Sequence, residues 1–349
     1  MSKQDRRVTL KDVAQQAGVS LTTAGKVLAN KAREFRISDQ TAQRVRKVAR
    51  RMGYVPSHAA RLLRSKRSGL IALLLSDATD PVPAGILHSV LENLHVHDYF
   101  PIVTMAETGL QQAYEMWLRS RAEGVIFCGA NARVTSSLFA NLRRDRIAPL
   151  MAGNYYYHKT SSSCFAKVAA VRVDDRAGIR LAIDHLVAQG RSRLAFIPGP
   201  GVFYDAIERR KAYEDLIREH HEPIVASIRG RPMYWQRGYV GAKELLQKYA
   251  RTIDAVIAYD DPVAMGAIKY FSEKGIHVPD DIAVVGFDNQ PEAQYSIPSL
   301  TSIQQPVDEI GRKSVEFMKQ MLQEQAEPKH LYVSPRLIAR ASTLGEQDS

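Results

Sequence analysis

The sequence has only two cysteines among its 349 residues. Cys128 lies in an apolar, strand-like run and Cys164 in a polar stretch, and their spacing suggests neither a metal clamp nor a disulfide framework. We therefore expect both cysteines to be structural or incidental. The sequence predicts no metal ion and no cofactor.

Long apolar runs are also missing. No window approaches the run of about eighteen apolar residues that a membrane span requires, and residues 1–9 are polar and charged rather than an apolar signal sequence. These absences argue against a membrane protein and against an exported one. We expect a soluble chain in the cytoplasm.

Acidic residues are scarce at the N-terminus. Residues 1–70 contain 17 Lys and Arg against four Asp and Glu, a net charge of +13, whereas the other 31 basic and 33 acidic residues leave 71–349 at −2. All of the excess positive charge therefore lies in the first fifth of the chain. A basic head on a nearly neutral body is typical of a protein that binds a polyanion at one end.

Residues 8–53 predict three short helices. Apolar residues recur at helical spacing, Thr9 and Ser20 are suited to cap the first two helices, and Gly18 breaks the chain between them. A third run, 38–52, ends at Gly53. Three helices within about 45 residues make a small independent unit.

The first two of these helices have the pattern of a helix-turn-helix. Gly18 allows the positive backbone angle of the tight turn, and Ala14 is small enough for the helices to cross closely. Leu21, Thr22 and Lys26 would then project outward. Because such a motif offers the start of its second helix to base edges in the major groove, the sequence predicts a DNA-binding head.

From residue 69 onward, apolar runs of strand length alternate with amphipathic helical stretches. This alternation indicates parallel, doubly wound α/β sheets, and the number of units suggests two lobes. The expected strands are 70–75, 124–128, 150–153, 170–173, 194–198, 255–259 and 282–287. The expected helices include 84–97, 176–189 and 263–274.

Several motifs together resemble the LacI/GalR (lactose-repressor) family of bacterial regulators, over essentially the whole chain. They are 9–14 (TLKDVA), 18–24 (GVSLTTA), 52–64 (MGYVPSHAARLLR), 173–178 (VDDRAG), 284–288 (VVGFD) and 300–306 (LTSIQQP). The resemblance implies a helix-turn-helix head over 1–55, a hinge helix and linker over 56–68, and a sensor over 69–349. That sensor would resemble periplasmic binding proteins, with two doubly wound parallel-sheet lobes that also mediate dimerisation.

The resemblance also implies which residues contact DNA. Leu21 and Thr22 match the base-reading positions, Lys26 stands where Arg is more frequent, and Leu63 matches the residue that wedges between base pairs at the operator centre. A plain linker is the alternative for the hinge, and the basic loop 31–36 either adds backbone contacts or forms a solvated turn. The full expected set is Thr9, Ser20, Leu21, Thr22, Thr23, Lys26, Ala59, Ala60, Leu63 and Arg64.

For the sensor, the resemblance implies a small-molecule effector held between the lobes. The matching positions are Asp80, Asn154, Val173, Asp205, Arg209, Met233, Asp260 and Asp288. Arg209 offers a bidentate donor fork and Asp288 two acceptors, which suits vicinal hydroxyls or a carboxylate. Asp80 and Asp260 stand where the family commonly has Asn, so these carboxylates either favour a polyhydroxy or cationic ligand or point away from the cleft. Trp235 is an alternative stacking residue to Met233.

We therefore expect a ligand-responsive transcriptional regulator, a repressor of a carbohydrate-related operon released by a sugar or sugar derivative. It should bind a pseudo-palindromic operator in double-stranded DNA as a homodimer, because one head covers only half of a two-fold site. No leucine heptads follow residues 337–340, so no tetramer is expected. A transport protein and an enzyme on a doubly wound fold are the competing classes, but no set of nucleophile, base and orienting group can be assembled. We expect no enzymatic activity, and an association with the nucleoid through DNA.

Overall fold

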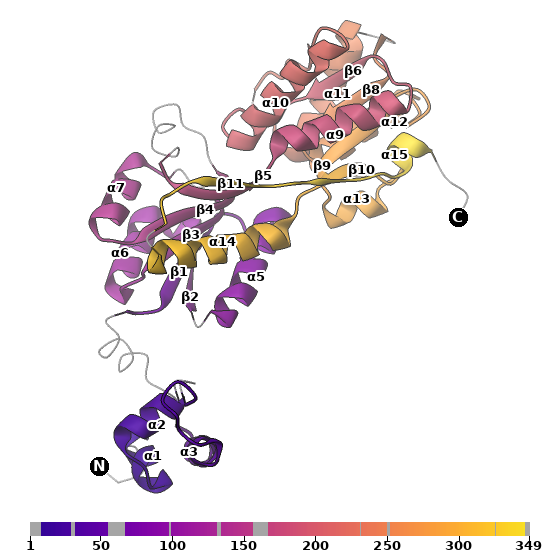
Figure 1. Cartoon of the computed structure of the whole chain (residues 1–349). Helices are drawn as coiled ribbons and strands as arrows, with labels where there is room; N and C mark the ends of the chain where they lie inside the picture. The colour runs from indigo at the N-terminus through magenta and orange to yellow at the C-terminus, as the bar shows by residue number, and fades with distance from the viewer. Residues whose placement is uncertain are drawn as a thin grey trace. The chain divides into compact units, whose positions relative to one another are not determined.

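The computed structural model describes residues 8–28, 32–54, 67–97, 99–130, 134–155, 167–230, 232–249, 252–324 and 326–345. The chain divides into two compact units, Met1–Ser68 and Gly69–Ser349, which we call the head and the sensor (Figure 1). Of the segment expected to form the hinge, 56–68, only Arg67 and Ser68 are among these residues.

The head contains the three helices that the sequence predicts: α1 (Leu10–Ala17), α2 (Leu21–Leu28) and α3 (Asp39–Arg51). Thr9 caps α1 as expected, because its hydroxyl accepts the Asp12 amide while the Asp12 carboxylate accepts the Thr9 amide at 2.8 Å. Small side chains fill the space between the helices, which lets their backbones approach closely. The buried apolar residues are Val13, Ala14, Ala17, Ala24, Val27, Ala32, Ala42, Val45, Val48 and Ala49.

The sensor contains two lobes, each built on a six-stranded sheet with helices on both faces (Figure 1). The first lobe, the N-lobe, contains β1 (Leu70–Leu75), α5 (Pro81–Val96), β2 (Phe100–Met105), the short 3-10 helix η1 (Ala106–Thr108), α6 (Leu110–Ser120), β3 (Gly124–Ala130), α7 (Ser136–Arg144), β4 (Ala148–Tyr155) and β5 (Ala169–Val173). Its strand order is β11-β5-β4-β3-β1-β2. Cys128 is buried in β3, which raises the pKa of its thiol to about 12, and Cys164 lies outside the described residues.

The second lobe, the C-lobe, repeats this architecture with strand order β12-β10-β9-β8-β6-β7. It contains α9 (Asp175–Ala188), β6 (Leu194–Ile197), α10 (Tyr204–Leu216), the 3-10 helix η2 (Ile217–Glu219), β7 (Ile224–Val225), α11 (Tyr234–Tyr249), β8 (Ala255–Ala258), α12 (Asp261–Glu273), β9 (Ala283–Asp288), α13 (Pro291–Tyr295) and β10 (Thr301–Gln304). The central strands β8 and β9 are buried almost throughout. Since helices cover both faces, these strands are continuously apolar, and that is why the sequence reveals them.

The chain crosses between the lobes three times. After β5 it enters the C-lobe at α9, and after β10 it returns to the N-lobe as α14 (Val307–Gln323), which packs against α5. After β11 (His330–Val333), which pairs with β5, it crosses again to β12 (Arg336–Ile338), which pairs antiparallel with β10 (Figure 1). The last helix, α15 (Ala341–Leu344), packs against β9 and β10. Among the described residues, no helix is long and apolar enough to span a membrane.

Candidate functional site

The turn between α1 and α2 has the geometry that the helix-turn-helix pattern predicts. Gly18 has φ +62°, in the left-handed region, and the amide of Val19 donates to the carbonyl of Ala14 at 3.1 Å. Beyond the turn, Leu21 is 53% exposed and Thr22 is also exposed, whereas the opposite side of α2 is buried in the head's core. The start of α2 is therefore free to meet another surface.

Ser20 is the cap of α2, as the sequence predicts. Its hydroxyl accepts the amide of Thr23 at 3.0 Å and lies 2.8 Å from the Thr23 hydroxyl. Ser20 is exposed and Thr23 half-buried, so the hydroxyl that does not donate within this pair can donate its O–H to a phosphate oxygen. A phosphate oxygen at this helix start would also meet the positive end of the helix dipole.

Lys26 does not simply project outward as expected. Its ammonium nitrogen lies 3.4 Å from the centre of the Phe35 ring, and the side chain is only partly exposed. Phe35 belongs to a turn whose ends are fixed, because Ala32 is buried in the head's core and Ile37 packs against it. Within the part of loop 31–36 that the structure describes, residues 33–36 are exposed, and the Phe35 ring covers part of the lysine.

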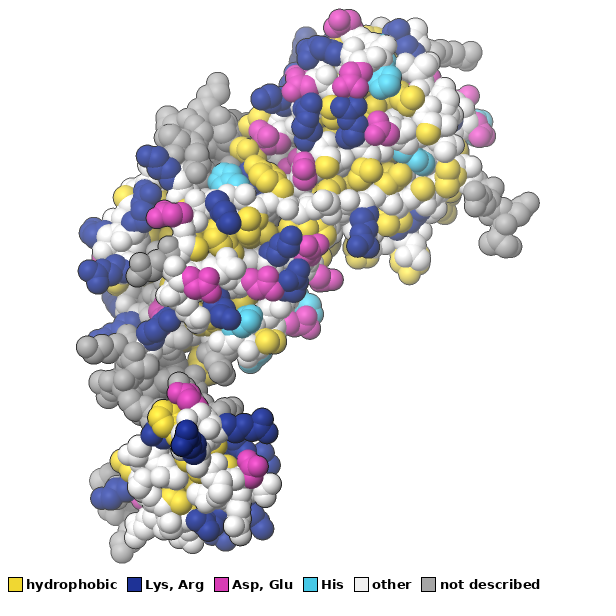
Figure 2. All heavy atoms as spheres, viewed as in Figure 1, with side chains coloured by type: hydrophobic (Ala, Val, Ile, Leu, Met, Phe, Trp, Pro, Cys, Tyr) yellow, Lys and Arg dark blue, Asp and Glu magenta, His cyan; other side chains and the backbone are white. Residues whose placement is uncertain are grey.

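Charge distinguishes the surface of the head from that of the sensor. On the face drawn in Figure 2, Lys and Arg predominate over Asp and Glu on the head, whereas both signs lie side by side on the sensor. This distribution agrees with the net charge of +13 over residues 1–70. The expected hinge contacts Ala59, Ala60, Leu63 and Arg64 lie outside the described residues.

In the sensor, one pocket is lined by residues of both lobes and encloses about 670 Å³, part of it open to solvent. It lies where the carboxyl ends of β1 and β3 in the N-lobe meet the loops after β6, β8, β9 and β10 in the C-lobe. In each sheet the chain order reverses beside the first of these strands, and such switch points are where open α/β sheets bind ligands. The lining includes Asp80, Val82, Pro83, Gly129, Pro200, Phe203, Asp205, Met233, Tyr234, Arg237, Tyr259, Asp260, Val263, Asp288, Gln290 and Gln305.

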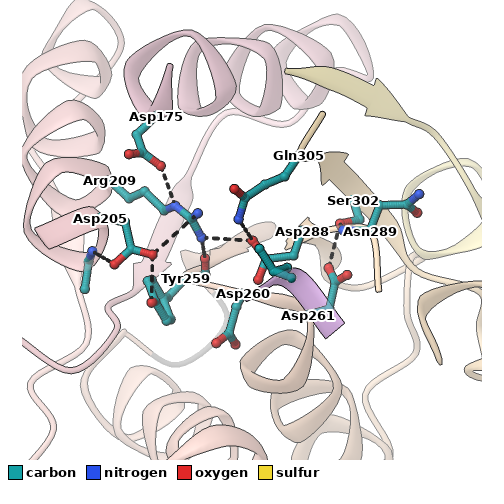
Figure 3. Close-up of polar contacts among 12 residues, drawn as sticks. Asp175, Asp205, Arg209, Tyr259, Asp260, Asp261, Asp288, Asn289, Ser302 and Gln305 are labelled. Atoms are coloured by element: carbon teal, nitrogen blue, oxygen red, sulfur yellow. Dashed lines mark hydrogen bonds and ion pairs between the residues drawn. The ribbon is translucent and has the colours of Figure 1, made fainter. Parts of the chain in front are cut away.

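Arg209 lies behind this pocket, among three carboxylates (Figure 3). Its Nε is 2.8 Å from Asp175 Oδ1, and its Nη atoms are 3.4 Å from Asp288 Oδ1 and 3.7 Å from Asp205 Oδ2. Nη1 also donates to the carbonyl of Tyr259 at 2.7 Å, and the guanidinium stacks on Phe287. With 1% exposure, Arg209 joins α9, α10 and β9 instead of offering its fork to a ligand.

The pocket carboxylates are held in unusual surroundings. Burial raises the pKa of Asp260 to about 7 and raises that of Asp288 well above its ordinary value, although Arg209 opposes the latter shift. Burial also raises the pKa of half-buried Asp80. Next to the pocket, fully buried Asp261 accepts the Ser302 hydroxyl at 2.6 Å and the Gln290 amide at 2.7 Å.

Backbone strain also gathers here. Asp288 has φ 104°, Asn289 φ 53° and Tyr234 φ 49°, values that side chains other than glycine rarely adopt. Hydrogen bonds hold the first pair in place, since the Asn289 amide donates to Ser302 Oγ at 2.9 Å and Asn289 Oδ1 accepts from Arg340 at 2.7 Å. Strained residues that surrounding contacts hold fixed are common at binding sites.

Comparison with known proteins agrees with this two-part organisation. Residues 9–57 match the model of the family described as "Bacterial regulatory proteins, lacI family", and residues 183–343 match that of a "Periplasmic binding protein-like domain". The chain is 27% identical over 346 residues to a ribose operon repressor of Halalkalibacterium halodurans, with 98% of each chain covered. It belongs to the lacI family of bacterial regulatory proteins.

Other family members extend the comparison. The regulator CelR of Thermobifida fusca is 28% identical, with 97% of this chain and 98% of the relative covered, and the repressor CytR of Escherichia coli is 26% identical, with 93% and 92% covered. Among solved structures, a lac repressor dimer bound to operator and the anti-inducer ONPF matches with a TM-score of 0.76 at 23% identity, covering 97% of this chain and all of that one. A CelR–cellobiose complex matches with a TM-score of 0.66 at 23% identity, covering 96% and 100%. These likenesses establish the fold of two parallel-sheet lobes.

The structure brings together five of the eight side chains expected in the sensor cleft: Asp80, Asp205, Met233, Asp260 and Asp288 line the pocket. Val173 and Arg209 do not line it, because Val173 is buried at the end of β5 and Arg209 is enclosed by carboxylates. Asn154 lies in β4, but its side chain is outside the described part of the chain.

Other lining residues were not singled out from the sequence. Gln305 follows β10 within a motif that resembles the family, so its position after a strand is a usable signal. Tyr234 and Arg237 lie on α11 with no local pattern to mark them, and Tyr234 rather than the more exposed Trp235 reaches the pocket. The turn at 199–201, after β6, contributes Pro200 to the lining.

Proposed function

We propose that this lacI-family regulator is a repressor that binds a pseudo-palindromic operator as a homodimer and is released by a small effector, a sugar or sugar derivative. The observation that carries the DNA-binding half is the exposed start of α2, where Leu21 and Thr22 face solvent on a basic head. The pocket between the lobes supports release by an effector, since its lining residues come from both lobes. Closure of the lobes on a ligand would change their relative position. Such a regulator would act in the cytoplasm, at the nucleoid.

Selection of binding sites from a random DNA pool tests the first half. We expect the full chain to enrich an inverted repeat, because two heads related by a two-fold axis read two half-sites. Thr22→Ala should relax preference at one position of each half-site by about 1–3 kcal/mol, while affinity for random DNA barely changes. A pool without any enriched motif would refute the proposal.

The segment 56–68 is proposed from the sequence to be a hinge that bends the operator. Leu63→Ala should then lower the bend angle measured by gel-shift bending assays and weaken operator binding, while non-specific DNA is bound as before. Equal losses on operator and random duplexes would make the segment a linker.

We also propose that the pocket binds its effector without converting it. The relatives named above are transcriptional regulators. A ligand recovered chemically unchanged after prolonged incubation supports this proposal, whereas appearance of a product would favour an enzyme. Sedimentation should show a dimer at micromolar concentration, and a monomer both with and without operator would contradict the assembly.

A further inference from the structure

The pocket presents more acceptors than its own residues use. Asp80 Oδ1 accepts the Val82 amide at 3.0 Å, Asp260 Oδ1 accepts the Val263 amide at 2.8 Å, and Asp288 Oδ1 accepts Gln305 Nε2 at 2.6 Å. Among the described residues, the second oxygen of each of these three carboxylates has no hydrogen-bond partner. Three acceptor oxygens from two lobes are therefore left for a ligand.

The nearby cations cannot satisfy these oxygens. Arg209 is already surrounded by Asp175, Asp205 and Asp288 (Figure 3). Arg237 lines the pocket, but its three nitrogens donate to the carbonyls of Pro198 at 2.6 Å, Gly199 at 2.9 Å and Pro232 at 3.1 Å. An anionic ligand would thus meet three carboxyl groups, opposed by the two N–H groups of Arg237 that these bonds leave unused.

The remaining wall is suited to a compact carbon frame. Pro200, Phe203, Met233 and Tyr234 supply apolar surface on the C-lobe side. Aromatic faces also attract cations, which adds to the pull of the carboxylates.

We propose that the effector carries a protonated amino group on a hydroxylated frame, as an amino sugar does, and that its ammonium lies between Asp260 of the C-lobe and Asp80 of the N-lobe. This inference rests on the proposed function and names the effector's class. Without a cation, burial disfavours ionisation of Asp260, and the nearby charge of Asp80 adds to this effect. With one, each carboxylate gains a charge-assisted hydrogen bond, so the ligand stabilises the closed sensor.

Matched pairs of probes test the charge directly. Calorimetry and thermal-shift measurements on the full chain at pH 7 would compare D-glucosamine with D-glucose and N-acetyl-D-glucosamine, and D-galactosamine with D-galactose. We expect at least one amine to bind at least about tenfold more tightly than its neutral partners, the effect of one desolvated charge pair. Neutral sugars that bind as tightly as the amines, or amines that cause no shift at 10 mM, would overturn the inference.

Two variants test whether the preference for an amine depends on the carboxylate of Asp260 or on any aspartate that caps a helix. Asp260→Asn keeps a side chain that can cap α12 but removes the charge, so the preference for amine over neutral sugar should fall about tenfold or more. Asp174→Asn is the control, because Asp174 caps α9 in the same way, accepting the Ala177 amide at 2.9 Å, yet lies outside the pocket lining. An equal preference in wild type and Asp260→Asn would also overturn the inference.

Operator binding separates this inference from the function on which it rests. If a neutral sugar binds the pocket and releases the protein from its selected operator, the proposed function stands and the amine inference fails. If the chain selects no DNA sequence, the proposed function fails whichever probe binds.

Discussion

Of the residues that the structure describes, the N-lobe contributes one charged side chain to the pocket, Asp80, whereas the C-lobe contributes four charged side chains alongside apolar ones. Val82, Pro83 and Gly129 join Asp80 on the first side. The second side contains Asp205, Arg237, Asp260 and Asp288, with Arg209 behind them. Two sheets with corresponding strand orders therefore contribute differently to the pocket, because most of its charged side chains come from the C-lobe.

The difference extends into the cores. The C-lobe buries Asp205, Arg209, Asp260 and Asp261, each at most 9% exposed. In the N-lobe, by contrast, the pocket side of the sheet packs Pro83 against Gly129, where an added Cβ would lie 2.7 Å from the proline ring. A buried ionic network holds its side chains in place but costs free energy, because the charges lose their contact with water. We therefore expect the stability of the C-lobe to depend more strongly on substitution and on pH than that of the N-lobe.

The largest effect should come from Arg209→Met. Removing the guanidinium leaves Asp175, Asp205 and Asp288 without their cation, which should destabilise the sensor by about 3–5 kcal/mol at pH 8 and by less at pH 5, where the carboxyls are more readily protonated. Arg210→Met is the control, since Arg210 is exposed and bonds only Glu214 in a surface pair, worth about 0–1 kcal/mol. Chemical denaturation measures both, and similar losses in the two variants would refute a network centred on Arg209.

Replacing a glycine by alanine in each lobe tests whether the two lobes also differ in how tightly their helices pack. In the C-lobe, a Cβ on Gly238 of α11 would lie 1.8 Å from the carbonyl oxygen of Val263 in α12, so Gly238→Ala must separate the two helices. We expect a loss of about 3 kcal/mol. In the N-lobe, Gly85→Ala meets only a Val307 methyl at 3.2 Å and should change stability by under about 1 kcal/mol. Equal melting temperatures for these variants would show that α11 and α12 can move apart freely.

These contrasts also explain what the sequence could predict of the fold. The strands β1, β8 and β9 are predicted nearly to the residue because helices bury both of their faces and the runs are apolar. The edge strand β2 contains Pro101 and is half-exposed, and β10 reads Thr-Ser-Ile-Gln, so neither has that signal. β11 and β12 are short strands whose pairing depends on contacts distant in the sequence.

For the site, the position of a residue was predictable but its partners were not. Asp80 and Asp260 lie between a strand and the helix that follows it, Asp288 ends β9, and parallel sheets place such residues together. Arg209 was expected to contact ligand because a guanidinium suits hydroxyls and carboxylates. The fold, which the sequence pattern does not reveal, places Asp175 Oδ1 of α9 2.8 Å from Arg209 Nε and directs the guanidinium toward the protein interior.

A pH-dependent difference should distinguish Asp260→Asn from wild type. Burial raises the pKa of Asp260 from 3.8 to about 7, so the folded state binds this proton more tightly than the unfolded state does. The resulting stabilisation is present below pH 3.8 and is lost as pH rises from about 4 to 7. Relative to wild type, Asp260→Asn should therefore gain stability over this range, on the order of 2 kcal/mol, whereas Asp174→Asn should not. Denaturation at pH 5 and pH 8 measures the difference, and parallel curves for the three proteins would contradict it.

The smallest effect belongs to the N-lobe counterpart, Asp80→Asn. Asp80 caps α5 as Asp260 caps α12, and burial raises its pKa as well, with Asp77 and Asp205 adding to the shift after burial. But Asp80 is only half-buried, so water screens its charge and Asn should preserve the cap. We expect its gain between pH 5 and pH 8 to be under about 1 kcal/mol, and smaller than that of Asp260→Asn under the same conditions. A gain for Asp80→Asn equal to that of Asp260→Asn would mean that burial disfavours the charge of both carboxyls equally, and it would contradict the expected difference between the lobes.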